Sequence, residues 1–355
     1  MGLDVLICVD DLPNQMLSQQ VSSVEVYEKM DMNTTFKLNF MIDVCDDDID
    51  GQIEGDTAPG KTISILAKVN DELVCLVKGP ITQQEAHIQH GGSGSWLHVE
   101  GEDTGKNLDH KPNYKVTDNA SDSDIAYAII SGEEHMIPDI ESTPHSLHTE
   151  ENHSHVQTES DLNLLRTLAQ RNGFHFWITY SPLGIATGHF KSRDLDGTPK
   201  LVLIVNHENY NIESLRVSAD TRLPSQTEGK QVSPRTKEVI GDTASVNDTA
   251  LGKKGLAQIS GDKKQTIHYA PPADDSGGLQ KPSEAVIKEA QWFISATCST
   301  NLQRLCGIVH NHTIVEVKGA GKKHSGKYYV TGVKHVINSV NHNMELEMAR
   351  NAWGN

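Results

Sequence analysis

Hydrophobic and polar residues alternate over short stretches in the first third of the chain. This pattern is typical of β-strands with one buried face. Strands 63–69 and 73–77 are close enough in the sequence to pair as a hairpin across residues 70–72. Several short strands separated by turns predict a barrel or a sandwich. The alternating stretches are residues 24–28, 36–42, 63–69, 73–77 and 96–100.

Helical spacing replaces this alternation in residues 119–218. Ser121 and Ser160 each precede acidic residues and a run with apolar positions three or four apart, which predicts two capped helices. Asn172-Gly173 is typical of the left-handed end of a helix. Strands are predicted at 174–180 and 185–190. The apolar positions expected to face the core are Ile125, Ala128 and Ile129 in the first helix and Leu162, Leu165, Leu168 and Ala169 in the second.

Residues 219–282 are polar and contain loop-like patches, so we expect long hairpin arms or loops that face a partner. A helix is expected to begin at Ser283. The chain then returns to alternating strands, as in a half-exposed antiparallel sheet. The predicted apolar face of the helix consists of Val286, Ala290, Phe293 and Thr297. The predicted strands are 308–309, 313–317, 328–337 and 344–348.

Together these elements predict a mixed, β-rich α+β fold, in which two β-barrel-like modules are joined by an α+β middle region. We expect an N-terminal β-barrel module at 1–118 and an α+β middle domain at 119–218. At 219–355 we expect a polar arm region followed by a helix and a C-terminal β-barrel module. A β-module at each end suggests an internal duplication. The chain of 355 residues is long enough for two or three domains.

The closing strands need cover for their apolar faces, which are formed by Tyr328 and Val330 and by Met344, Leu346 and Met348. A module of roughly fifty residues buries too little surface to be stable alone. We therefore expect helix packing or a neighbouring chain to cover these faces.

The net charge of −17 argues against nucleic acid as the main partner, because phosphate binding needs clustered lysine and arginine. The five cysteines lack any C-x-x-C spacing, so neither a zinc knuckle nor a disulfide framework is predicted. No stretch of about 18 apolar residues is present, and the amino end lacks the basic start of a signal peptide. We expect synthesis in the cytoplasm and no membrane insertion by this chain.

The stretch DDDIDGQIEGDTAPGKT, residues 46–62, fits two site patterns. Asp46, Asp48 and Asp50 match the start of a calcium loop, but Thr57 stands where a glutamate closes the ligand shell. Residues 55–62 satisfy the phosphate-binding pattern G-x-x-x-x-G-K-[ST]. That site requires a helix after the lysine, whereas the following residues predict a strand. We interpret the segment as an acidic loop that binds no nucleotide, and keep the three aspartates as candidate metal ligands.

The histidines suggest a second candidate site, because four of the 18 lie within eleven residues. They are His145, His148, His153 and His155. The helical H-E-x-x-H spacing of zinc ligands is absent, so a solvated linker is favoured over a metal tract. His335 alternates with apolar residues in a predicted strand and is expected on the opposite face. No residue pattern indicates a catalytic site, so we predict no cofactor and no enzymatic activity.

Two segments carry a family resemblance. VQTESDLNLLRTLAQRNGFHFWI, residues 156–178, closely resembles the helix-then-strand signature of the late control protein D family of contractile phages and of the hub portion of type VI secretion spike proteins. HSGKYYVTGVKHVINSVNHNMELEMARN, residues 324–351, is similar to the closing strands of the same family. The positions of the signature are Asp161, Leu165, Leu168, Asn172, Gly173, Gly326, Tyr328, Val330, Val333, His335, Arg350 and Asn351.

The resemblance implies a structural baseplate hub of a contractile injection system or phage tail. In that family two barrel modules per subunit are arranged about a threefold axis, so that a trimer presents six similar units and adapts a trimeric spike to a sixfold tube. The implied partners are two further copies, a central spike protein, an inner tube or tube-initiator protein, and tape-measure and other baseplate proteins. The resemblance also implies incorporation into the baseplate of the assembled particle. We expect the spike to be a separate polypeptide.

The alternative from another class is a metal- or nucleotide-dependent effector enzyme that uses residues 46–62 or the tract at 145–155. A hub is expected to be an obligate trimer without turnover. An effector is expected to bind metal or nucleotide stoichiometrically.

Overall fold

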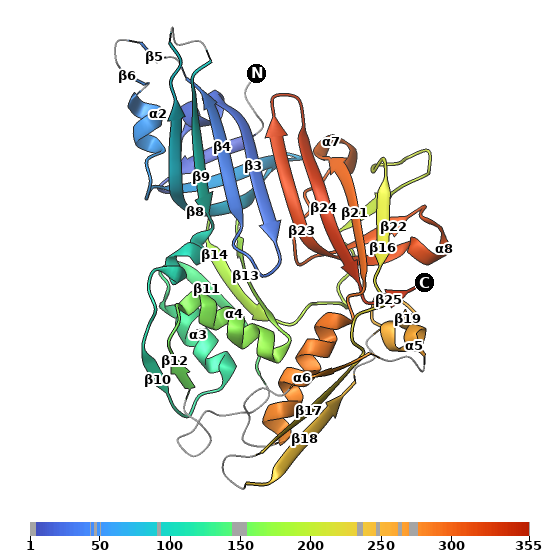
Figure 1. Ribbon diagram of the computed structural model, residues 1–355. Coiled ribbons are helices and arrows are strands. Elements are labelled where there is room, and N and C mark those ends of the chain that lie inside the picture. The colour runs from blue at the N-terminus through green and yellow to red at the C-terminus, as the bar shows by residue number, and fades with distance from the viewer. Residues whose placement is uncertain are drawn as a thin grey trace.

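A computed structural model describes residues 5–42, 44–45, 48–49, 51–90, 94–143, 155–232, 237–245, 249–261, 265–269 and 276–354. Its largest feature is a 13-stranded sheet containing strands from both ends of the chain (Figure 1). All pairings in it are antiparallel except β15–β22. The strands from the first part are β1 Val5–Val9, β2 Leu12–Pro13, β3 Val21–Lys29, β4 Thr35–Met41, β7 Thr62–Val69, β8 Glu72–His87 and β9 Trp96–Glu102. Those from the second part are β15 Leu201–Ile204, β16 Leu215–Ala219, β21 Ile294–Asn301, β22 Ile314–Lys318, β23 Gly326–Asn338 and β24 His342–Arg350.

Two groups of strands in this sheet follow the same order. The N-terminal strand set runs β7-β8-β9-β4-β3, and the C-terminal strand set runs β22-β23-β24-β21-β16. Corresponding strands also occur in the same order along the chain. The two sets meet where β23 pairs with β3, so they lie side by side in one continuous sheet.

The long strand of each set changes partner half-way. β8 pairs with β7 along residues 72–80 and with β9 along 81–87. β23 pairs with β22 along 326–329 and with β24 along 329–337. In β8 the change requires a glycine, because a Cβ at Gly79 would lie 1.9 Å from the carbonyl oxygen of Glu102. The first half of each long strand therefore belongs to a second layer that covers one face of the main sheet.

The middle region packs helices α3 and α4 against a three-stranded sheet (Figure 1, lower left). Ser121 caps α3 with a capping box, and Ser160 caps α4. Gly173 ends α4 at φ 67°, in the left-handed region that favours glycine. The sheet order is β11-β14-β13, and β10 pairs separately with β12. The elements are η1 Thr104–Asp109, β10 Lys115–Thr117, α3 Asp122–Gly132, β11 Met136–Ile140, β12 His155–Gln157, α4 Asp161–Asn172, β13 His175–Tyr180 and β14 Ala186–Lys191.

A fourth region lies between β16 and β21 in the sequence. Its hairpin β17–β18 is extended by β20, and α6 lies along the hairpin and also contacts α4 (Figure 1). The elements are β17 Gln226–Val232, β18 Val239–Ala244, β19 Lys254–Gly255, α5 Leu256–Ser260, β20 Thr266–His268 and α6 Ser276–Ala290. The remaining short elements are α1 Gln15–Gln20, β5 Val44–Cys45, β6 Asp48–Ile49, α2 Gly51–Asp56, α7 Leu302–Leu305, α8 Gly321–His324 and β25 Ala352–Trp353.

Three buried clusters form the main hydrophobic cores. The first lies within the N-terminal strand set around Phe36 and Ile65, and it includes Ile337 from β23. The second lies within the C-terminal strand set around Val333 and Leu346. The third joins α3 and α4 to β13 and β14. The domain boundaries at 118 and 218 stay predictions.

The β-rich α+β fold class is confirmed, as are the strand after Lys61, the caps at Ser121 and Ser160, and the burial of Leu165 and Leu168. The structure also corrects several predictions. The exposed Ala128 does not face the core, where Ala126 and Ile130 lie instead. Residues 308–309 form no strand.

The predicted helix at Ser283 is also wrong in its bounds. Helix α6 begins at Ser276, seven residues earlier, and ends at Ala290. Phe293 therefore lies beyond the helix, and Thr297 belongs to β21, a strand that the sequence did not predict. Among the described side chains of the helix, the buried apolar ones are Ala285 and Ile287, whereas Val286 is half-buried.

The apolar faces of the closing strands are covered within the chain. Tyr328, Val330, Met344, Leu346 and Met348 are all at most 1% exposed. Their cover comes from residues that include Leu203, Ile212, Phe293, Leu305 and Val309. These faces therefore need no neighbouring subunit.

Candidate functional site

The exposed face of the continuous sheet carries ion pairs across the seam between the two strand sets. Lys334 of β23 lies 3.0 Å from Glu25 of β3, and Lys29 of β3 lies 3.5 Å from Glu347 of β24. The Tyr27 hydroxyl donates to Glu347 at 3.2 Å. Each pair is partly exposed and contributes at most about 1 kcal/mol. The seam is thus a hydrated polar surface that spans both strand sets.

The same face continues across the N-terminal strand set. Lys37 of β4 pairs with Glu100 of β9 at 2.6 Å. His98 bridges Asn39 and Glu100 through its two ring nitrogens, at 2.6 and 2.8 Å. The ring of His87 stacks on Trp96 with centroids 5.3 Å apart. This surface presents polar and aromatic side chains around an open hollow lined by residues that include Asn39, Trp96 and His98.

Within the described part of the chain, two strands in the layer that carries this face, β8 and β16, have an unpaired edge along part or all of their length. Among the described residues, no strand pairs with the outer edge of β16 or with the outer edge of β8 beyond Pro80. Unpaired strand edges present free backbone donors and acceptors to other chains. The edges are therefore candidate interaction sites.

Behind the seam, buried ionisable groups join the N-terminal and C-terminal strand sets. Glu28 of β3 is 4% exposed; it accepts from the Asn311 backbone N–H at 2.9 Å and lies 2.8 Å from His310 Nδ1. Burial alone raises the pKa of Glu28, but the His310 and His335 rings outweigh it and hold that pKa well below its ordinary value. Burial lowers the pKa of His310, but the Glu28 carboxylate outweighs burial and the net shift is upward. The buried carboxylate of Glu28 and the half-buried imidazole of His310 thus form an ion pair.

His335 belongs to the same cluster, which corrects its predicted position on the opposite face. Its side chain is fully buried, and Nδ1 lies 3.0 Å from Nε2 of His342. Burial holds the pKa of His335 below its ordinary value. Burial and the neighbouring His335 lower the pKa of His342 to about 3. These two imidazoles are therefore neutral and share one hydrogen bond.

A second polar cluster, around the buried His175 side chain, joins the middle region to both strand sets. His175 of β13 lies 2.8 Å from Asp31, which follows β3, and 3.4 Å from Glu289 of α6. Arg193 holds Glu289 through both guanidinium ends, at 2.6 and 2.8 Å. Burial alone lowers the pKa of His175, but the carboxylates of Asp31 and Glu289 outweigh it and raise that pKa. The cluster is a charged clamp between three parts of the chain.

Aromatic stacking completes this cluster. His312 stacks on Trp177 with centroids 4.0 Å apart, and its Nδ1 lies 2.9 Å from the Tyr329 hydroxyl. Burial and the neighbouring His175 and Arg193 hold the pKa of His312 well below its ordinary value. A proton on His312 would add a third positive charge at this place. The cluster thus links β13 to the strand β23 and to the segment before β22.

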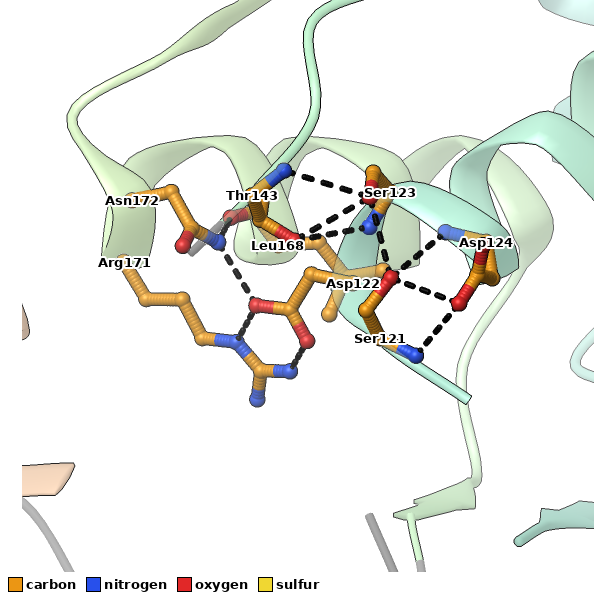
Figure 2. Close-up of polar contacts among 8 residues, drawn as sticks. All are labelled: Ser121, Asp122, Ser123, Asp124, Thr143, Leu168, Arg171 and Asn172. Atoms are coloured by element: carbon orange, nitrogen blue, oxygen red, sulfur yellow. Dashed lines mark hydrogen bonds and ion pairs between the residues drawn. The ribbon is translucent and has the colours of Figure 1, made fainter. Parts of the chain in front are cut away.

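Helices α3 and α4 are fixed to each other by a carboxylate (Figure 2). Asp122 is 3% exposed and accepts from Arg171 Nε at 2.5 Å and from Asn172 Nδ2 at 2.6 Å. Arg171 also contacts the other carboxylate oxygen of Asp122 through its terminal nitrogen. The side chain of Asn172 donates further to the Leu168 carbonyl at 2.7 Å. The signature residue Asn172 therefore holds the end of α4 against the start of α3.

The signature residues near the carboxyl end form a second buried anchor. Arg350 is 1% exposed and donates to the carbonyls of Leu251, Ser325 and Gly354 at 2.6, 3.1 and 2.8 Å. Asn351 accepts from the Leu251 backbone N–H at 3.2 Å. The pair thus ties the end of β24 to the segment before β19.

The other signature residues also lie at structural positions. Asp161 accepts from Asn113 and Gln157 at 2.9 and 2.6 Å, which ties the start of α4 to the β10–β12 ribbon. Gly326 has φ 126°, a conformation that other residues rarely adopt, and Tyr328 donates to the His324 carbonyl at 2.8 Å. Their role as a family signature stays a prediction.

The sequence-predicted ligand sites are only partly covered by the structure. Asp46 and Asp50, like His145, His148 and His153, lie outside the described residues. Asp48 and His155 are placed in β6 and β12 as backbone, and their side chains are not described. Lys61 pairs with Asp10 at 2.6 Å, and Thr62 begins β7, so residues 55–62 do not open a helix.

Within the described ranges, no group of three or more His, Cys, Asp or Glu side chains is placed to hold a metal ion. No helix in those ranges is long and apolar enough to cross a membrane.

The buried clusters around Glu28 and His175 were missed at the sequence level. Glu28 lies 282 residues from His310, and Asp31 lies 144 residues from His175, so no local spacing could indicate these pairs. The only local signal was a histidine in an apolar strand at His335.

Solved structures of tail proteins share this fold. The tail protein from Neisseria meningitidis MC58 matches at a TM-score of 0.67 and 14% identity, covering 99% of this chain and 98% of that chain. The 43 kDa tail protein of prophage MuSo2 from Shewanella oneidensis matches at 0.68 and 15%, covering 98% of both. The E. coli c3393 protein, a component of the type VI secretion system, matches at 0.56 and 10%, covering 98% of this chain and 78% of that one. At these identities the likeness establishes the fold.

Comparison of sequences gives two results. No curated protein sequence matches this chain significantly. The family model described as the Alg8 N-terminal domain matches residues 4–339, which is most of the chain. The chain therefore belongs to the Alg8 N-terminal domain family.

Proposed function

We propose that this protein is a structural baseplate hub of a contractile injection system or phage tail, related to the late control protein D family, and that three copies form a ring. The observation that carries the proposal is the repeat of one strand order, side by side, in a single sheet. Three chains would supply six similar units around a threefold axis. Such a ring matches a sixfold tube on one side and a threefold spike on the other.

The layering of the strand sets suggests how the units are oriented. A second layer, which contains β1 and β7 in one set and β15 and β22 in the other, lies on one side of the main sheet, while the seam face is bare (Figure 1). The side of the main sheet that carries the second layer is thicker and would lie farther from the threefold axis. The polar seam face would then line the central opening of the ring. Ion pairs between neighbouring strands would make the wall of this opening hydrophilic, with positive and negative charges in balance.

A hub requires that the parts of each subunit keep fixed positions relative to one another, and it requires no enzymatic activity. The charged clamps at Glu28 and at His175 hold the parts of the subunit in one arrangement. We propose a non-enzymatic protein without a cofactor, whose partners are a spike protein, an inner tube or tube-initiator protein, and tape-measure or other baseplate proteins. It would be made in the cytoplasm of the producing cell and incorporated into the baseplate.

Electron microscopy of the purified protein tests this proposal. Top views should show a ring with a central opening and six similar lobes in threefold arrangement. Monomeric or twofold particles, even with spike and tube proteins supplied, would rule out the hub.

A further inference from the structure

The two strand sets are joined by the pairing of β23 with β3. The same kind of strand pairing can join two chains. Within the chain, the second half of β23 pairs antiparallel with β3, with Lys334 opposite Tyr27 and Val336 opposite Glu25. Lys334 reaches diagonally to Glu25 at 3.0 Å. By the repeated strand order, β8 corresponds to β23, and β16 corresponds to β3. β8 and β16 are the strands that carry the two open edges.

Register shifts align the two long strands residue by residue. The shift in β8 lies between Ile81 and Gln83, and the shift in β23 lies between Val330 and Gly332. After its shift, β8 pairs without interruption with β9, starting at Gln83–Glu100. After its own shift, β23 pairs without interruption with β24, starting at Gly332–Glu347. Glu85 therefore corresponds to Lys334.

The pairings through the next two strands align β16 with β3. Gly101 of β9 lies opposite Phe36, which lies opposite Val26. Met348 of β24 lies opposite Ala296, which lies opposite Val217. Val217 therefore corresponds to Val26, and its neighbour Arg216 corresponds to Glu25.

The two positions that correspond to the ion pair within the chain also carry opposite charges, but the acidic and basic residues have changed places. Lys334 and Glu25 form the pair within the chain, and their counterparts are Glu85 and Arg216. Glu85 and Arg216 are exposed, and neither forms an ion pair with another described residue. Opposite charges on matching edge positions favour one register of pairing.

The second seam pair has no such counterpart. Lys29 and Glu347 correspond to Asp220 and Glu100, which are both acidic. Asp220 is already paired with Arg222 at 2.9 Å, and Glu100 with Lys37 at 2.6 Å. Each of these two carboxylates is therefore already paired with a basic residue of its own chain, so they add little repulsion between the paired strands.

We propose that β16 of one copy pairs antiparallel with residues 83–87 of β8 in the next copy, with Ser218 opposite Glu85, Val217 opposite Ala86, and Arg216 opposite His87. This inference rests on the proposed ring, since in a closed ring each β16 edge meets a β8 edge of the neighbouring copy. The occupant is a second copy of the chain, because the complementary edge is present on the same molecule. Such head-to-tail contacts are heterologous and close when the rotation closes.

Cysteine crosslinking tests the register. Residues opposite each other in an antiparallel pair have Cα atoms about 4.5–5.5 Å apart, which suits a disulfide. The parent is the chain with its exposed Cys306 replaced by serine. Ala86→Cys with Val217→Cys should give covalent trimers on mild oxidation. Ala86→Cys with Ser218→Cys is the matched control, since Ser218 points to the other face, and it should crosslink at least about tenfold more slowly.

Charge reversal provides an independent readout. Glu85→Arg and Arg216→Glu should each weaken trimer association by roughly five- to tenfold. The double variant should restore it. If the ring forms but neither the crosslink nor the restoration is seen, the proposed joint is wrong and the hub remains. If no trimer forms at any concentration, both the joint and the proposed function are wrong.

Discussion

His342 allows the buried cluster to be tested by a change of pH. The His342 side chain is 8% exposed at the start of β24, and its Nε2 lies 3.0 Å from His335 Nδ1. Its pKa is lowered by burial and by His335 to about 3. The unfolded chain binds a proton on this imidazole below about pH 6.5, whereas the folded chain does not do so until near pH 3. Stability is therefore lost as the pH falls below about 6.5.

The size of the effect follows from the linkage relation. At pH 5.5, one unit below the ordinary pKa, the proton favours the unfolded state by about 1.4 kcal/mol, and at pH 7.5 by almost nothing. His342→Gln retains a hydrogen-bonding group and removes the titration. The variant should cost about 1 kcal/mol at pH 7.5, and this cost should disappear or reverse at pH 5.5.

Urea unfolding of parent and variant at pH 7.5 and 5.5, at one fixed protein concentration, measures this change. The difference in unfolding free energy between the two proteins should shift by about 1.4 kcal/mol in favour of the variant at the lower pH. His110→Gln, which replaces an exposed histidine outside this cluster, is the matched control. A difference for His342→Gln that does not change with pH would refute the assignment of a neutral, buried imidazole.

Two further predictions concern the middle region and residues 55–62. Leu165→Ala should destabilise the protein by about 2–5 kcal/mol, since Leu165 is fully buried between α4 and the β13–β14 strands; a variant that melts like the parent would contradict this burial. ATP with magnesium should show no saturable binding in calorimetry, because Lys61 pairs with Asp10 and β7 follows it; binding that is lost in Lys61→Ala would overturn this.

The strands and helices that the sequence predicted are those with strong local signals. Val24, Val26, Phe36 and Leu38 alternate with polar residues, and β3 and β4 follow that alternation. Ser121 and Ser160 mark helix starts because their hydroxyls satisfy free backbone N–H groups.

The missed features have physical reasons. β21 buries Ala296 and Cys298 on one face. Both side chains are small, so the alternation of apolar and polar residues in this segment is too weak to predict a strand. Pro282 followed by Ser283 is typical of a helix start, but the helix continues through it.

The candidate site itself depends on contacts between distant parts of the chain. The β3–β23 joint brings Glu25 beside Lys334, and the Glu28 cluster brings together residues from three separate segments. No periodicity within one segment encodes such a pairing. The resemblance of residues 156–178 and 324–351 to a hub family pointed toward a trimeric ring, and the repeated strand order gives that hypothesis a geometry.

The molar mass of the purified protein tests the central claim most directly. Light scattering across a range of concentrations should give a trimer, three times the 39.0 kDa chain or about 117 kDa, which persists on dilution. A mass of one chain at all concentrations, or of two chains, would contradict a threefold hub built from the repeated strand sets.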